Sequence, residues 1–213
     1  MTPLIDLLFP AVGTRLPTDH GYSLYSCVSR LLPCLHDGSI PFALVPITGQ
    51  HVGKGLIALD TSRSRLRLRL PAADLPRVLP LAGKTLNLLG HRLTLGVPQV
   101  FPIRPAPSLK ARSVTFKNST EPEPFLRRAK IELDRLGIRG RLQMPWHIDR
   151  EGRFEPHRHV MRVKDSRIVC FPLRVERLSE KDSLRLQETG LGGRRHMGGG
   201  VFVPFDAEDS HDD

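Results

Sequence analysis

The feature of the sequence that most restricts the possible folds is the segment from Ser62 to Leu70 (SRSRLRLRL), in which basic and apolar residues alternate. Alternate residues of a β-strand point to opposite faces of a sheet. The leucines at 66, 68 and 70 therefore share one face, and the arginines at 63, 65, 67 and 69 share the other. We expect a strand that buries its leucines in a core and presents its arginines either to solvent or to an anionic partner.

The elements expected around this strand follow one another in the order strand, helix, strand, strand, helix, strand. A helix is expected after the N-cap candidates Thr18 and Asp19, with apolar residues at helical spacing until Pro33. The remaining expected elements are strands at 3–12, 41–48 and 56–70, a short helix at 72–82, and strands at 84–88 and 91–101. This is the element order of a ferredoxin-like unit.

A proline-rich stretch, IRPAPSL at 103–109, reads as a linker, and after it the same order begins again. The elements expected there are strands at 109–116, 138–144, 158–164, 166–177 and 201–205 and helices at 121–137 and 179–188. The sequence predicts an α+β fold of tandem ferredoxin-like units, with domains at 1–104 and 105–205 and an acidic disordered tail at 206–213. This duplication rests on element order alone.

The charge balance points to a polyanionic partner. The chain carries 32 Lys and Arg against 22 Asp and Glu, a net charge of +10. Five of the acids lie in the last eight residues, so the rest of the chain carries 32 − 17 = +15. Most of the cations are arginine, whose planar guanidinium binds phosphate through two hydrogen bonds and stacks on bases. The pattern favours a nucleic-acid partner over a basic protein that has none.

Other classes of protein fit the sequence poorly. No apolar run reaches the roughly 18 residues of a membrane-spanning helix, and the N-terminus lacks the pattern of a signal peptide. We therefore expect a cytoplasmic protein without a membrane partner. Cys27, Cys34 and Cys170 have no paired spacing, which predicts reduced thiols rather than a disulfide framework or a zinc site.

The stretch GLGGRRHMGGG at 190–200 combines six glycines with a central basic cluster. Glycine lets a backbone approach a ligand closely, so we expect Gly192 and Gly193 to contact nucleic acid together with Arg194, Arg195 and His196. The stretch is neither a Walker A motif nor a dinucleotide fingerprint, and no cofactor is expected. The alternative is a flexible surface loop.

Two stretches carry a resemblance to a known family. The pattern of Gly190 to Gly192, five residues, and Gly198 to Phe202 resembles the glycine-rich signature of the RAMP superfamily. The beginning of the chain, FPAVGTRLPTDHGYSLYSCVSRLLPCLH at 9–36, is similar to the start of a small, Cas-six-type branch of CRISPR repeat endoribonucleases. Between about 40 and 185 the resemblance covers element order only.

The resemblance implies an endoribonuclease that binds a CRISPR repeat RNA stem-loop and cuts it without a metal or cofactor. Attack by the 2′-hydroxyl would leave 2′,3′-cyclic phosphate and 5′-hydroxyl ends. Other subunits of a CRISPR effector complex are further partners that it implies. The main alternative is a RAMP-type subunit that binds RNA without cutting it. A phosphodiesterase of the two-histidine type is disfavoured, because no histidine is followed two residues later by Ser or Thr.

His20 is the candidate general base. It is expected in the first turn of the helix after Asp19, where the helix dipole attracts phosphate and keeps the imidazole neutral. The family often carries a catalytic histidine in this region. The alternative is that His20 caps the helix or packs a tight turn with Gly21. Tyr25, on the same helix, is the second catalytic candidate, as a hydrogen-bond donor or a surface for base stacking; the alternative is a half-buried anchor.

Further RNA contacts are expected from Arg15, just before this helix, and from Arg127 and Arg128 on the helix at 121–137. An arginine-rich helix can follow the phosphates of an A-form stem. A cluster of Trp146, Glu155 and three histidines (His147, His157 and His159) lies further along. Its spacing is too loose for a metal site, and no metal is predicted.

Overall fold

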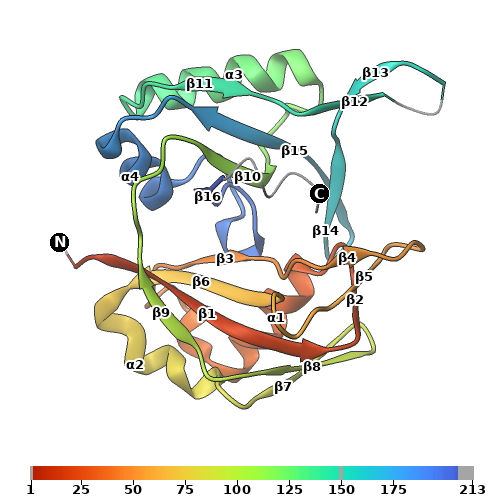
Figure 1. The fold of residues 1–213 in the computed structure, drawn as a ribbon, viewed down its shortest axis with the longest axis vertical. Coiled ribbons are helices and arrows are strands. Elements are labelled where there is room, and N and C mark those ends of the chain that lie inside the picture. The colour runs from red at the N-terminus through yellow and green to blue at the C-terminus, as the bar shows by residue number, and fades with distance from the viewer. Residues whose placement is uncertain (1, 149–150, 206–213) are drawn as a thin grey trace. The chain divides into compact units, whose positions relative to one another are not determined.

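The computed structural model describes residues 2–148 and 151–205. It is an α+β structure whose chain divides into two compact units between Ile103 and Arg104, one residue from the boundary expected at 104/105. Each unit is an antiparallel sheet with helices (Figure 1). The acidic tail expected at 206–213 lies outside the described residues. Within those residues, no helix is long and apolar enough to cross a membrane.

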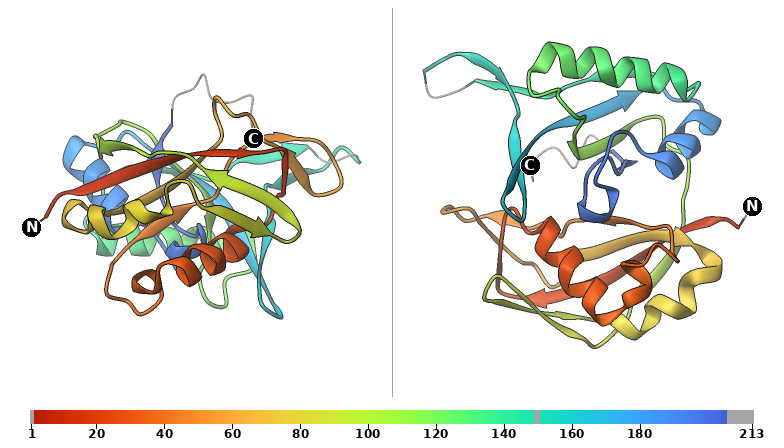
Figure 2. Two further views of the ribbon diagram at one scale, coloured as in Figure 1. Left: turned by 90° about the horizontal axis from the view of Figure 1, so that it is seen from below. Right: turned by 180° about the vertical axis from the view of Figure 1, so that it is seen from behind.

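The N-terminal unit is a ferredoxin-like unit. Its central strands are β1 (Leu4–Gly13), β3 (Ala43–Val45), β6 (Arg65–Pro71) and β8 (His91–Leu95), in the spatial order β3-β6-β1-β8, extended by β7 (Thr85–Leu88). The helices are α1 (Gly21–Leu31) and α2 (Leu75–Val78), the latter flanked by 3₁₀ turns at Ala72–Asp74 and Leu79–Leu81. Both helices lie on one face of the sheet (Figure 2). The segment 91–101, expected as one strand, is two, because β9 (Gln99–Pro102) leaves β8 and pairs with β1.

The register of β1 against β6 places the alternating leucines where the sequence predicted. Leu7 lies opposite Leu68 and Phe9 opposite Leu66, and all four side chains are fully buried. Residues of α1, including Leu24 and Val28, complete this core. The helix ends before Pro33, which begins a 3₁₀ turn at Pro33–Leu35 because proline cannot donate the next helical hydrogen bond.

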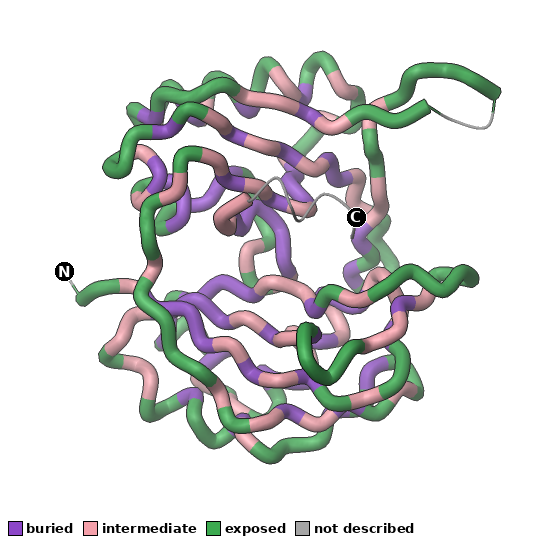
Figure 3. The backbone as a smooth tube through the Cα atoms, in the orientation of Figure 1, coloured by how far each residue is buried: buried purple, intermediate pink, exposed green. Residues whose placement is uncertain are grey.

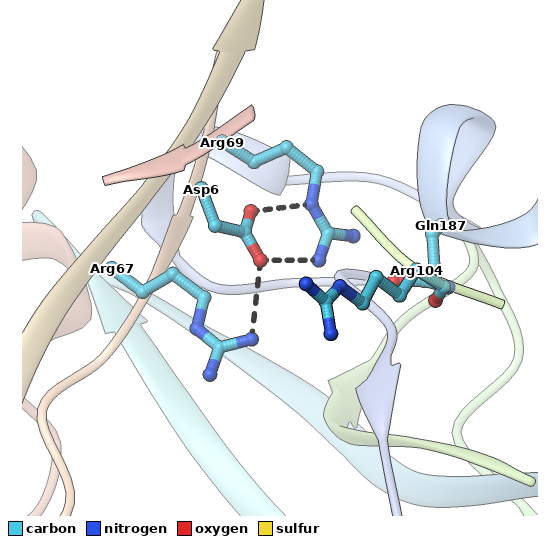
Figure 4. A network of polar contacts seen from close by, with 5 residues as sticks. All are labelled: Asp6, Arg67, Arg69, Arg104 and Gln187. Atoms are coloured by element: carbon cyan, nitrogen blue, oxygen red, sulfur yellow. Dashed lines mark hydrogen bonds and ion pairs between the residues drawn. The ribbon is translucent and has the colours of Figure 1, made fainter. Parts of the chain in front are cut away.

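The sequence alternation allowed the arginines of β6 to be exposed, but in the structure Arg65 and Arg67 are half-buried and Arg69 is buried. Arg69 is 1% exposed, and its Nε and Nη2 donate to the two carboxylate oxygens of Asp6 at 2.7 and 2.9 Å. Arg67 donates to the same carboxylate at 3.2 Å (Figure 4). The guanidinium of Arg65 donates to backbone carbonyls of its own turn. The side chains of Arg65, Arg67 and Arg69 therefore bind groups of the N-terminal unit itself, and Asp6 is the counter-charge of Arg67 and Arg69.

The C-terminal unit repeats the order of the first. Its sheet runs β11 (Arg141–Gln143), β15 (Ser166–Glu176), β10 (Leu109–Val114), β16 (Val203–Pro204), and β14 (His159–Val163) pairs with β15. Helices α3 (Pro122–Arg135) and α4 (Glu180–Thr189) cover it (Figure 2). Phe125, Ala129 and Leu133 of α3 lie in its core. A 3₁₀ turn at Arg195–Met197 lies in the loop between α4 and β16.

Two small sheets were not expected from the sequence. The segment 56–70 contains a separate strand, β5 (Leu56–Ala58), which pairs with β2 (Arg15–Pro17) and β4 (Gln50–His51). In the C-terminal unit, β12 (Trp146–Ile148) and β13 (Phe154–Pro156) form a hairpin that is exposed along most of its length (Figure 3). All of these strands are only two or three residues long, and β2 pairs with a strand some forty positions later, so the sequence alternation gave no sign of them.

Candidate catalytic site and RNA interface

His20 lies at the N-cap of α1 rather than inside its first turn. Its side chain is fully buried. Nδ1 lies 2.6 Å from the carbonyl oxygen of Pro17, and Nε2 accepts a hydrogen bond from the backbone N–H of Ile47 at 3.0 Å. Because a carbonyl only accepts and an N–H only donates, these partners require the neutral tautomer with the proton on Nδ1.

This geometry conflicts with the expectation that His20 is the general base. A base must offer a lone pair within hydrogen-bond reach of the hydroxyl that it deprotonates. The lone pair of Nε2 is already engaged by Ile47, and no part of the ring reaches the surface. His20 occupies the N-cap position considered as its alternative, but its side chain makes no capping hydrogen bond to α1 and instead joins the start of the helix to Pro17 and Ile47.

Tyr25 contacts a different histidine. Its hydroxyl lies 3.1 Å from Nδ1 of His36, and the two rings are 6.3 Å apart between centroids. His36 is exposed and Tyr25 is half-buried, with the tyrosine ring stacked on Phe42. The 3₁₀ turn that starts at Pro33 folds the chain back, which brings His36 beside a residue eleven positions earlier. The pair joins an accessible imidazole to a phenol.

The residues after His36 are held by their own hydrogen bonds. Asp37 accepts from the backbone N–H of Ser39 at 2.8 Å, and hydrogen bonds from Ser39 hold the pKa of Asp37 below its ordinary value. Arg77 donates to the hydroxyl of Ser39 at 2.7 Å and pairs with Asp74 at 3.0 Å. The segment that carries His36 is therefore ordered and has a guanidinium beside it.

Sequence reasoning missed His36, although it ends the stretch at 9–36 that carries the family resemblance. Helical spacing relates residues three or four apart, and it gives no sign of a contact across a turn. The available signal was Pro33. A proline that ends a helix can begin a turn, and that turn can bring the next few residues, here Leu35 and His36, back against the helix.

The glycines at 190–200 serve mainly the conformation of the loop itself. Gly192 has a φ of +78°, and a Cβ there would lie 2.5 Å from the carbonyl oxygen of Thr115. At Gly199 a Cβ would lie 2.4 Å from the carbonyl oxygen of Gly193. Only Gly193 is both exposed and open, with no atom within 4 Å of the Cβ position. The loop is tightly folded rather than flexible.

The basic cluster in this loop divides by exposure. Arg194 and His196 are exposed, whereas Arg195 is half-buried, and its Nε would lie 3.0 Å from a Cβ on Gly190. Partial burial, followed by the charge of Arg195, lowers the pKa of His196 below its ordinary value. At neutral pH the loop therefore presents Arg194 as a cation and His196 as a neutral ring.

The other expected RNA contacts lie on the surface of their own units. Arg15 is exposed at the start of β2, and Arg127 and Arg128 are exposed on α3. Arg128 pairs with Glu132 one turn along the helix at 2.7 Å, which orients its guanidinium. Arg15, like the Tyr25–His36 pair, belongs to the N-terminal unit, and the other two belong to the C-terminal unit.

The cluster near Trp146 is divided between two elements: Trp146, His147 and Glu155 lie on the exposed hairpin, and His157 directly follows it. The rings of Trp146 and Phe154 stack on one face with centroids 5.1 Å apart, and those of His147 and His157 lie 4.6 Å apart. His159 lies on β14, where Nε2 is 2.6 Å from the hydroxyl of Ser113. Across residues 2–148 and 151–205, no three His, Cys, Asp or Glu side chains are grouped as metal ligands.

Comparison with known proteins identifies the family. The family model described as Cas6 Crispr matches residues 5–207. The CRISPR-associated endonuclease Cas6 of Myxococcus xanthus (strain DK1622) is 39% identical over 200 residues, which cover 94% of this chain and 81% of that protein. Two solved structures share the fold: a Cas6-related protein of Pyrococcus furiosus (TM-score 0.60, 12% identity, 97% of this chain and all of that one) and a RAMP protein that binds different RNA substrates (TM-score 0.57, 12% identity, 96% and all). The chain belongs to the Cas6 family.

Proposed function

We propose that this protein is an endoribonuclease that binds the stem-loop of a CRISPR repeat RNA and cuts it once per repeat without a metal ion. The observation that carries the proposal is the hydrogen-bonded pair of Tyr25 and the exposed His36. Membership of the Cas6 family and the endonuclease name of the Myxococcus relative support it.

The chemistry needs a nucleophile that RNA supplies itself. The 2′-hydroxyl attacks the adjacent phosphorus, the bond from phosphorus to the 5′ oxygen breaks, and the products are a 2′,3′-cyclic phosphate and a 5′-hydroxyl. A base must take the 2′ proton, and the leaving oxygen must gain one. Because the attacking and leaving oxygens lie on opposite sides of phosphorus in an in-line displacement, one histidine serves as the base, and the 5′ oxygen takes its proton from a second group or from water.

His36 replaces His20 as the residue assigned to this role. If Nδ1–H of His36 donates to the hydroxyl oxygen of Tyr25, Nε2 of this exposed residue carries the lone pair of the base, and the phenol proton remains available for a phosphate oxygen. Burial and two backbone hydrogen bonds give His20 a positioning role instead, since it joins the start of α1 to Ile47. Arg77, which is paired with Asp74, donates to Ser39 and so holds the segment after His36 in place.

RNA binding in this proposal uses residues of both units. Arg15 is the exposed cation of the N-terminal unit, and Arg127, Arg128 and Arg194 are those of the C-terminal unit. The other contacts lie in the glycine-rich loop: Gly192, Gly193, the half-buried Arg195 and the neutral His196. Gly193 is the position where RNA could approach the backbone, because its Cβ side is open. Each phosphate contact releases counterions, so binding should weaken steeply as salt is raised.

The test is cleavage of a labelled repeat RNA in excess EDTA, beside the same RNA with a 2′-deoxy nucleotide at the cut site. We expect one cut in the first RNA, with a cyclic phosphate on the upstream fragment, and binding without cutting in the second. Cutting of the deoxy RNA at the same site would refute the 2′-hydroxyl mechanism. Tight binding with no cutting of either RNA would instead make the protein a non-catalytic RNA-binding subunit.

A further inference from the structure

A groove of about 680 Å³ lies within the C-terminal unit, beside the glycine-rich loop. Four segments line it: the turn after β10, the end of α3, the start of β15, and the loop itself. The lining residues are Thr115 to Asn118, Thr120, Glu132, Arg135, Arg167 to Val169, and Gly192 to Arg194. Its volume is that of small-ligand sites, about 300–1,000 Å³, which is too small to enclose a nucleic-acid duplex.

The rim of this groove carries an excess of positive charge. Lys117, Arg135, Arg167 and Arg194 each come from a different one of the four segments, and all are exposed. The one carboxylate in the lining, Glu132, is already neutralised, because Arg135 at 2.8 Å and Arg128 at 2.7 Å both pair with it. The rim is therefore built to attract an anion from several sides.

The rest of the lining is apolar. Phe116, Ile168 and Val169 are half-buried. The ring of Phe116 packs against Phe125, with centroids 5.2 Å apart, and Phe125 packs on Phe171 of the core. An apolar wall below a cationic rim suits a nucleotide, whose base is flat and apolar on its faces and whose phosphate is charged.

The walls are held in place before any ligand arrives. The backbone N–H of Gly193 donates to the carbonyl of Thr115 at 3.2 Å, and that of Gly200 donates to Ser113 at 2.6 Å. These bonds fasten the glycine-rich loop to β10, and the conformation at Gly192 allows the close approach. A preorganised site loses little conformational freedom when its ligand binds.

We propose that this groove binds unpaired nucleotides of the repeat RNA next to its stem, with a base against Phe116 and the phosphates on Arg135, Arg167 and Arg194. The proposal rests on the proposed function and adds a part of the substrate to it. Stem and flank are thus held by different surfaces, and the groove contributes affinity only for RNA that carries the unpaired flank.

The experiment compares two RNAs, the repeat stem-loop with its single-stranded flanks and the same stem-loop trimmed of them. Dissociation constants are measured across a salt series for the wild type, Arg167→Ala, Arg194→Ala and the control Arg139→Ala. Arg139 is an exposed arginine of the same unit outside the groove, so its variant matches the charge change.

We expect the wild type to bind the flanked RNA at least tenfold more tightly than the trimmed one, and each groove variant to lose most of that advantage. The salt slope for the flanked RNA should fall by about 0.7 for each phosphate contact removed. Equal losses on both RNAs, or losses no larger than those of Arg139→Ala, would overturn the groove assignment while leaving the proposed function intact. If the wild type shows no preference for repeat RNA over an unrelated stem-loop, the proposed function itself fails.

Discussion

Replacing His20 with alanine should damage folding far more than chemistry. The substitution leaves two backbone groups without the partner that His20 now provides, the buried N–H of Ile47 and the partly buried carbonyl of Pro17. An unsatisfied buried group costs about 1–3 kcal/mol and a partly buried one less, so the two together predict a loss of about 2–4 kcal/mol, before any cavity term. That is a large part of the roughly 5–15 kcal/mol that stabilises a typical domain.

The assay is urea unfolding together with single-turnover cleavage at a temperature where the variant is folded. His20→Asn is the matched variant, because its amide can still donate to Pro17 while leaving Ile47 unpaired, and it should lose about half as much stability. Cleavage by folded His20→Ala should stay within a few-fold of the wild type. A 10²- to 10⁴-fold loss of rate, the usual contribution of a general base, with unchanged stability would refute the positioning role.

Three further predictions concern other parts of the chain. Asp6→Asn should lower the free energy of unfolding by about 3–5 kcal/mol, because it leaves buried Arg69 without its counter-charge; urea titration measures this, and a change below 1 kcal/mol would contradict it. Gly192→Ala should lower the free energy of unfolding by about 1–3 kcal/mol, because the position has a positive φ and a Cβ there would clash with a backbone oxygen. Gly193→Ala should leave the free energy of unfolding and the melting temperature unchanged. Equal effects of the two substitutions would argue against the loop geometry. The pKa of His196 is lower in the folded state, so as pH falls the unfolded chain binds the proton first, and stability is lost below about pH 6.5. His196→Gln should therefore reduce the dependence of the melting temperature on pH between pH 7 and 5. An unchanged pH dependence would contradict the assignment.

The sequence was most informative where burial alone decides structure. The leucines of β6 follow a strict period of two, and the structure buries them as expected. The strand order of each unit likewise follows from the order of the elements along the chain. The same alternation could not show the fate of the arginines, because Asp6, their partner, lies some sixty residues earlier and only the register of β1 against β6 brings it opposite Arg69.

The candidate site was less predictable, because its contacts cross turns. Tyr25 was identified from its place on α1, but its partner His36 depends on the reversal at Pro33. His20 was expected to be accessible, and a sequence cannot show that Pro17 and Ile47 enclose it. No sequence pattern marked Arg167 as a binding residue, because it lines the groove only where the turn between β14 and β15 places it.

The most direct test of the account is the single-turnover cleavage rate of repeat RNA in excess EDTA, measured for the wild type, His36→Ala, and His51→Ala as an exposed histidine control. The account predicts a 10²- to 10⁴-fold loss for His36→Ala, with RNA affinity and melting temperature unchanged, and a rate close to the wild type for His51→Ala. Wild-type cleavage that requires a metal, or a His36→Ala variant that cuts at the wild-type rate, would contradict it.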